Sequence, residues 1–275
     1  MGIRVIAELT FREASRRKIL WAALVLGLAF LALYSLGLHL MLSGMDANAG
    51  PIERREGANA LLIVGLYAVN FLVVMMVVLT SVDTLAGEIA SGTIQSIVIK
   101  PMSRWEVALG KWLGFAAMLT LYILLMAGGV VALTYFITGH TAHNIVFGMG
   151  LMWMEGLLLL SVTFLWGTSF STLATGVLTF GLHGFAFIGG WIEEFGALSQ
   201  SHSAVKAGVI ASFIMPSEAL WRRAAFEMQS PLVNALGVSP FSNASVPSAG
   251  MIVYALVYGG VAFGLALRCF GRKDL

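Results

Sequence analysis

Long stretches without charge alternate with short charged segments along the chain. Five such stretches are bounded by Lys18 and Asp46, Glu56 and Asp83, Lys111 and Glu155, Glu155 and Glu193, and Glu227 and Arg268. An α-helix needs about 20 apolar residues to cross the ~30 Å hydrocarbon core of a bilayer. The pattern therefore predicts a chain that crosses a membrane several times.

Polar breaks at residues 139–144 and 169–172 divide the third and fourth stretches into three helices. The last stretch contains three prolines, and only its end is uninterrupted. Six spans are predicted, at residues 19–42, 59–82, 112–138, 145–168, 173–192 and 250–267. The predicted fold is an all-α polytopic membrane protein in which residues 19–275 form a single six-helix transmembrane domain.

Composition excludes a soluble domain. Hydrophobic residues make up 59% of the chain and charged residues 11%, whereas soluble domains carry about 25% charged residues. The first apolar run is longer than the 7–15-residue core of a signal peptide, and no clear cleavage site follows it. The single cysteine, Cys269, excludes an intrachain disulfide and a cysteine metal cluster.

The distribution of Lys and Arg predicts the orientation, because cytoplasmic loops carry an excess of basic residues. With the N-terminus in the cytoplasm, eleven basic residues lie inside and five outside. The five are Arg54, Arg55, Lys206, Arg222 and Arg223. Both termini and the loop at residues 83–111 are therefore predicted to be cytoplasmic, and the loop at residues 193–249 external.

Residues 1–18 are predicted to form an amphipathic helix on the inner membrane surface. One face carries residues spaced by four, Arg4, Glu8, Arg12 and Arg16, and the other carries Ile3, Ile6, Ala7, Thr10 and Ala14. A basic amphipathic segment beside a span is typical of an interfacial helix. The alternative is a solvated tail whose basic residues serve only to orient the chain.

The cytoplasmic loop at residues 83–111 is predicted to hold a short crosswise helix. The helix of the second span continues as far as Ile89 and is interrupted at Gly92. A short apolar face then follows, and Pro101 ends it. Ser103 and Glu106 have the spacing of a capping box, which predicts a new helix that runs into the third span. The apolar face of the short helix suits a protein partner.

The external loop at residues 193–249 contains an apolar segment, residues 207–215, that is about half the length needed to cross a bilayer. Pro216 precedes a segment with two charge pairs spaced by four, Glu218 with Arg222 and Arg223 with Glu227. This pattern predicts a re-entrant hairpin. The alternative is a small external cap that takes no part in a pathway.

The sequence "GEIASGTIQSIVIKPMSRWEVALGKWLG" resembles the inner-loop signature of permease subunits of type 2 ABC exporters. The matching elements are Gly87-Glu88, Gly92-Thr93, Pro101, Ser103-Arg104 and Gly110-Lys111. The segments "IASFIMPSEALWRRAAF" and "ALRCFGRKDL" are also similar to members of this ABC-2-type permease family. The resemblance covers nearly the whole chain.

The resemblance implies a connecting helix at residues 1–18, a coupling helix seated in an ATPase subunit, and external half-helices over the pathway. The residues it assigns to ATPase coupling are Glu88, Gly92, Thr93, Ile94, Ile97, Val98, Lys100, Pro101 and Arg104. It implies two ABC ATPase subunits, a second permease subunit in a homodimer or heterodimer, and a place in the bacterial inner membrane among lipid, with no nucleic acid. ATP and Mg are expected on the ATPase.

The chain itself carries no phosphate-binding loop at its Gly-Lys sequence. Trp112 follows Gly110-Lys111 where Ser or Thr is needed, and Trp105 stands where the first glycine would be. The protein is therefore expected to be a non-catalytic subunit without a cofactor of its own. His140 and His143 are too few ligands for a metal site, so none is predicted.

Glu155 is the one charged residue inside the fourth predicted span. A charge there costs about 2.5–3.5 kcal/mol on insertion scales, so it needs a partner or a wet cavity. At a rise of ~1.5 Å per residue, His183 of the fifth span lies at a matching depth. We therefore predict a Glu155–His183 contact, which is either a polar point on the substrate path, a proton site, or a structural hydrogen bond.

Two other functions compete with the exporter. A proton-coupled secondary transporter would use Glu155 and His183, and it predicts inverted repeats with broken helices in both halves. The sequence has a short apolar segment in one half only. An intramembrane protease could use Glu193-Glu194, but Leu198 stands where the accompanying arginine would be, and paired carboxylates alone do not make a site.

Overall fold

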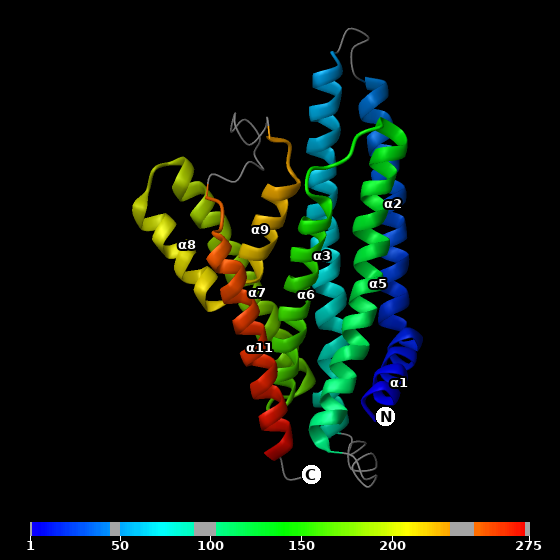
Figure 1. The fold of residues 1–275 in the computed structure, drawn as a ribbon, viewed down its shortest axis with the longest axis vertical. Coiled ribbons are helices and arrows are strands. Elements are labelled where there is room, and N and C mark those ends of the chain that lie inside the picture. The colour runs from blue at the N-terminus through cyan, green and yellow to red at the C-terminus, as the bar shows by residue number, and fades with distance from the viewer. Residues whose placement is uncertain (1, 45–49, 91–102, 232–244, 273–275) are drawn as a thin grey trace.

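The computed structural model describes residues 2–44, 50–90, 103–231 and 245–272, and every regular element in these ranges is a helix (Figure 1). The helices, in chain order, are α1 (Gly2–Arg16), α2 (Lys18–Gly44), α3 (Pro51–Ala90), α5 (Arg104–Thr138), α6 (Ile145–Gly167), α7 (Thr172–Leu198), α8 (His202–Ile214), α9 (Ser217–Met228) and α11 (Ala249–Arg272).

Six of these helices, α2, α3, α5, α6, α7 and α11, are long and apolar enough to cross a membrane. They correspond one to one with the six predicted spans, so the all-α polytopic fold is confirmed. Helix α8 is apolar but has only 13 residues, which gives a length of about 20 Å. It is too short to cross the hydrocarbon core.

Helix α3 differs from the prediction at its first end. It begins at Pro51, whereas the predicted span begins at residue 59. The first turns carry Glu53, Arg54 and Arg55, all exposed. Charged residues end an apolar run without ending a helix, and proline is favoured at the first helical position. With 40 residues, α3 is about 60 Å long.

The two helical segments predicted at either end of residues 83–111 are present. Helix α3 continues beyond the bilayer-length segment to Ala90, and α5 begins at Arg104. Its start is stabilised by the predicted capping interaction, in which the Ser103 backbone N–H donates to Glu106 Oε2 at 3.0 Å. The Ser103 hydroxyl and this backbone N–H both lower the pKa of the Glu106 carboxyl.

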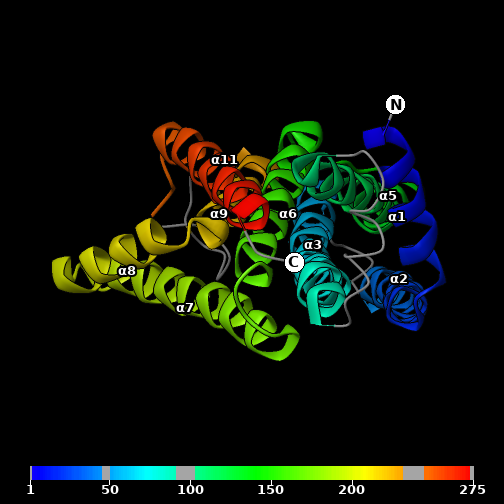
Figure 2. The same cartoon turned by 90° about the horizontal axis from the view of Figure 1, so that it is seen from below.

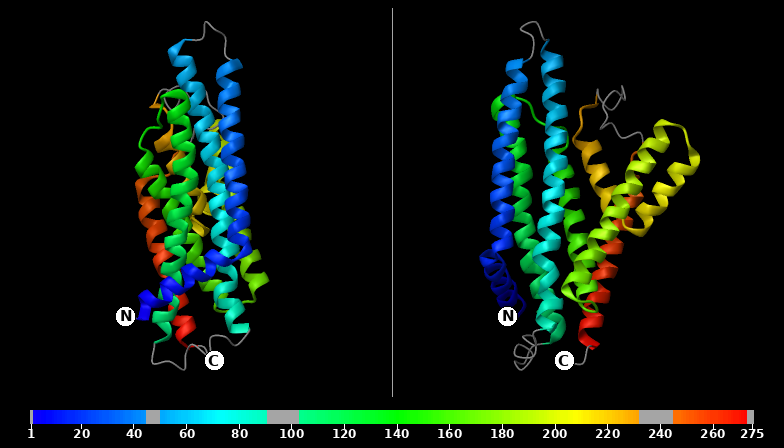
Figure 3. Two further views of the ribbon diagram at one scale, coloured as in Figure 1. Left: turned by 90° about the vertical axis from the view of Figure 1, so that its right-hand side faces the viewer. Right: turned by 180° about the vertical axis from the view of Figure 1, so that it is seen from behind.

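Both ends of the described chain lie at one end of the molecule. Helix α1, the last turn of α3, the first turn of α5 and the last turn of α11 lie together there (Figures 1 and 3). The predicted topology places the termini and the 83–111 loop on one side of the membrane. The arrangement of the helices is the one this topology requires.

Helices α7 and α8 form a close antiparallel hairpin that leans away from the other helices (Figures 1 and 2). A Cβ atom added at Gly208 would lie 2.4 Å from Glu193 Cβ and 2.5 Å from Gly189 O, and one added at Gly196 would lie 2.7 Å from Ala204 Cβ. Only glycine permits this approach. Helix α9 follows the hairpin and buries its apolar face, including Trp221, Ala225 and Met228, against the other helices.

Candidate functional site

The predicted coupling residues mostly lie outside the described residues. Gly92, Thr93, Ile94, Ile97, Val98, Lys100 and Pro101 all fall in the range 91–102. Glu88 is in the last turn of α3, and Arg104 is the first residue of α5. The structure therefore gives the two helical ends from which the coupling segment extends, and their surroundings.

Helix α1 lies across α5 near the start of α5, as the left view of Figure 3 shows. Two glycines of α5, one turn apart, permit the close contact with α1. A Cβ atom at Gly110 would lie 2.7 Å from Ile6 Cβ and 2.9 Å from Ile3 O, and one at Gly114 would lie 2.8 Å from Ala7 O. The predicted apolar face of α1 therefore packs against α5. Two apolar side chains of α1 remain exposed, Val5 at 52% and Leu9 at 56%.

Asp83 links three elements next to the loop. Arg17, between α1 and α2, places its Nη1 atom 3.6 Å from Asp83 Oδ2 and also pairs with Glu13 at 2.9 Å. The hydroxyl of Thr172, the first residue of α7, donates to Asp83 Oδ1 at 3.2 Å. The segment that connects α1 to α2, the end of α3 and the start of α7 are thus held by one exposed carboxylate.

A second group of polar side chains is buried among the spans. Glu155 of α6 is 1% exposed and Asn70 of α3 is 5% exposed. The Asn70 amide lies beside the Glu155 carboxyl, but neither carboxyl oxygen of Glu155 nor Oδ1 of Asn70 has a hydrogen-bond partner of ordinary geometry. Glu218 of α9 is close enough to interact electrostatically with Glu155.

The structure does not join Glu155 to His183. His183 Nδ1 lies 3.0 Å from Ser217 Oγ at the start of α9, and the Glu155 oxygens have no partner. The predicted hydrogen bond between the two is therefore absent. Matching depth fixes the position of a residue along a helix axis but not the direction of its side chain around that axis. Here Glu155 lies beside α3, and His183 bonds to α9.

A buried ion pair fixes α9 to the end of α7. Arg222 Nη2 lies 2.8 Å from Glu193 Oε2, and each side chain is 5% exposed. The Ser245 hydroxyl, just before α11, donates to Glu193 Oε1 at 2.5 Å. Of the two charge pairs predicted on this segment, Arg223–Glu227 is present at 2.5 Å. Arg222 instead pairs with Glu193, because α9 is buried against α7 rather than solvated.

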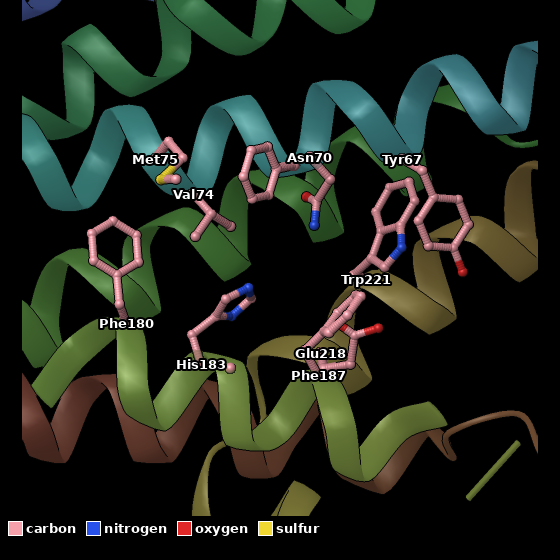
Figure 4. Close-up of a pocket in the computed structure, with 11 residues that line it drawn as sticks. Tyr67, Asn70, Val74, Met75, Phe180, His183, Phe187, Glu218 and Trp221 are labelled. Atoms are coloured by element: carbon pink, nitrogen blue, oxygen red, sulfur yellow. The ribbon is translucent and has the colours of Figure 1, made fainter. Parts of the chain in front are cut away.

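A cavity of about 260 Å³ opens between α3, α7 and α9 (Figure 4). Five aromatic rings and three polar side chains face it. Helix α3 contributes Tyr67, Asn70, Phe71, Val74 and Met75, α7 contributes Phe180, His183, Gly184 and Phe187, and α9 contributes Glu218 and Trp221. Two chemically distinct sites thus emerge, a loop-end region with α1 and a polar cavity among the helices.

Sequence reasoning missed Asn70 and misplaced Glu218. Asn70 is an amide in the middle of an otherwise apolar run, and that pattern is a usable signal of a buried polar contact. The spacing of four residues predicts a charge pair of Glu218 with Arg222, whereas the structure buries Glu218, which is 3% exposed. Within the described ranges no three His, Cys, Asp or Glu side chains come together as a metal site.

The chain matches a model of a known protein family. A family model described as ABC-2 family transporter protein covers residues 4–275. A search of curated proteins finds no significant match.

Proposed function

Because the chain belongs to the ABC-2 transporter family, we propose that it forms the translocation pathway of an exporter driven by a separate ATPase chain. The protein is a multi-pass membrane permease with six apolar helices. The direction of transport and the source of energy are the proposal. They are supported by the absence of a phosphate-binding loop at Gly110-Lys111 and by the resemblance of the inner loop to those of exporters.

The observation that carries the proposal is the position of the two helical ends that flank residues 91–102, the end of α3 and the start of α5. These two ends lie at the same end of the molecule as α1 and the C-terminal turn of α11. In the proposed transporter this end faces the cytoplasm, and the segment at residues 93–100 is a coupling helix seated in a groove of the ATPase. Two ATPase subunits with ATP and Mg, and a second permease subunit, identical or different, complete the assembly.

The proposed membrane arrangement assigns roles to the two short helical regions. We place the chain in the bacterial inner membrane with both termini in the cytoplasm. Helix α1 is the connecting helix at the inner surface. One face of α1 packs against α5, and the exposed apolar residues of α1 face lipid. Helices α8 and α9 are external half-helices, since α8 is too short to cross and backbone that re-enters a membrane must be buried in protein.

Replacing Ile97 with Asp tests the proposed coupling helix. The change would put an unpaired carboxylate into the contact with the ATPase, and a comparable loss at an interface costs ~2–5 kcal/mol. We expect the ATPase to dissociate from the permease and ATP-dependent transport to stop. Insertion should persist, because the loop lies outside the bilayer. Copurification and transport in vesicles are the measurements.

Gln95→Asp is the matched control, because it adds the same charge to the polar face of the same segment. It should retain the ATPase. Full copurification and transport with Ile97→Asp would contradict the proposed coupling role.

A further inference from the structure

The cavity between α3, α7 and α9 has more acidic than basic groups. Glu218 lines the cavity and interacts electrostatically with Glu155. Glu194 and Glu218 both act on Tyr67 in its wall, and the guanidinium of Arg222 is the basic group that acts on Glu218. Arg222 is already in a buried ion pair with Glu193. Glu218 faces the cavity, with Glu155 near it. An added cation would therefore be favoured there over an added anion.

Asn70 provides a second polar contact with an unused acceptor. Its side chain is 5% exposed, and its Oδ1 atom has no hydrogen-bond partner. Figure 4 shows the amide directed from α3 toward the space above His183. A buried polar atom without a partner is uncommon in proteins. A ligand that donates an N–H to Oδ1 would satisfy it.

The walls of the cavity are aromatic. Tyr67 and Trp221 lie at one side in an edge-to-face contact, with ring centres 4.6 Å apart. Phe71, Phe180 and Phe187 complete the aromatic lining. Aromatic faces attract ammonium groups, and this attraction is larger where water is excluded.

The size and opening of the cavity limit the ligand. At about 260 Å³, it is slightly smaller than the ~300–1,000 Å³ of typical small-molecule sites. Phe71 and Phe187 line it and remain 59% and 41% exposed on the outer surface of the helices. A compact polar head fits inside, and an alkyl chain can extend past these two residues into lipid.

We propose that this cavity binds the ammonium head of a cationic amphiphile, with Glu218 as the counter-charge and Asn70 as a hydrogen-bond acceptor. The statement that this amphiphile is a transported substrate rests on the proposed function. Binding itself requires neither the ATPase nor ATP.

Three ten-carbon probes with different heads test the inference, namely decylamine, decanol and decyl sulfate. Saturable binding is measured by equilibrium dialysis to the full chain in lipid nanodiscs, with binding to empty nanodiscs subtracted. The pH is 8.5, because burial raises the pKa of Glu218 to about 8 and decylamine remains a cation. We expect saturable binding of decylamine and at least tenfold weaker binding of the other two.

Variants locate the site. Glu218→Gln should weaken decylamine binding at least tenfold, and Asn70→Leu should weaken it severalfold. Phe71→Ala removes a largely exposed wall residue without disturbing the core and should also weaken binding. Glu53→Gln, at the exposed start of α3, is the matched loss of a carboxylate and should leave it unchanged.

The inference is overturned if decylamine does not saturate, if decanol binds as well, or if Glu218→Gln and Phe71→Ala both bind like the unmodified chain. None of these outcomes affects the ATPase contact, which the Ile97→Asp experiment measures separately. Loss of the ATPase contact would likewise leave decylamine binding intact.

Discussion

Arg222 and Glu193 form an ion pair that is almost completely shielded from solvent, with 5% exposure on each side. Removing one partner from such a pair typically costs about 3–5 kcal/mol, because a charge remains buried without its counter-charge. We expect Arg222→Leu to lower the free energy of unfolding by this amount. The double variant with Glu193→Gln should regain part of the loss. Thermal unfolding in detergent measures both.

The exposed pair Arg12–Glu8 is the control, since it joins the same residue types at 2.6 Å with 70% and 56% exposure. Exposed pairs contribute at most about 1 kcal/mol. Arg12→Leu should therefore hardly change the melting temperature. An equal loss in the two single variants would mean that burial of the Arg222–Glu193 pair has no special effect.

Glu218 predicts a pH dependence. It lies in α9, outside the six spans, and burial raises the pKa of its carboxyl from 4.5 to about 8. Between these values the unfolded chain loses the proton that the folded chain keeps, so stability falls as pH rises. We expect the melting temperature to decrease between pH 5 and 8 because of this group and to level off above pH 8.

Glu218→Gln should remove this contribution to the slope. The titratable and charged groups around Glu218 are Tyr67, Glu155 and Arg222, with His183 in the same cavity, and they remain in the variant. Identical pH profiles for the two proteins would exclude Glu218 as the titrating group.

At the level of single residues, burial could be predicted better than partnership. Glu155 was identified as a buried polar residue from its place in an apolar run. Its neighbour could not be derived, because helical rise determines depth but not which helix faces the side chain. Arg222 illustrates the same limit, since its i,i+4 neighbour is visible in the sequence and Glu193 on another helix is not.

The contact between helices α1 and α5 depends on two glycines of α5, and a substitution at one of them tests it. Gly114→Val would place side-chain atoms against Ala7 O and Thr10, which lie 2.8 Å and 2.9 Å from a Cβ atom there. We expect α1 to separate from α5. Trypsin should then cleave faster at Arg12 and Arg16, which limited proteolysis in detergent can measure.

Gly128→Ala in the same helix is the control, because nothing lies within 4 Å of a Cβ atom at that position. It should leave proteolysis unchanged and stabilise α5 by up to about 1 kcal/mol. Faster cleavage in both variants would indicate a general destabilisation of α5 rather than loss of the α1–α5 contact.

At the level of elements, the helices that end at a sequence signal were predicted well. Ser103 with Glu106 gave the start of α5, and the polar break at residues 139–144 gave its end. The start of α3 at Pro51 was missed, because hydrophobicity measures fit to a bilayer and does not limit a helix that extends beyond it.

The topology of the whole molecule can be tested with its own cysteine. Cys269 is exposed near the end of α11, at the end of the molecule where both termini lie. A membrane-impermeant maleimide should label it from the cytoplasmic side only. In a Cys269→Ser background, Leu198→Cys and Ser230→Cys should be labelled from the outside. Labelling of Ser230→Cys from the cytoplasm would mean that the α8–α9 region crosses the membrane.

The length of α3 has a mechanical consequence. One end of this helix adjoins the loop to which the ATPase is proposed to bind, and near the other end Glu56 accepts a hydrogen bond from Ser230 at 3.0 Å, just beyond α9. The 40 residues between Pro51 and Ala90 form one uninterrupted helix. A rod of about 60 Å that tilts by about 5° around its midpoint moves its two ends by about 3 Å in opposite directions. Helix α3 can therefore act as a rigid lever that converts a small push at the inner loop into an opposite displacement beneath the external cap.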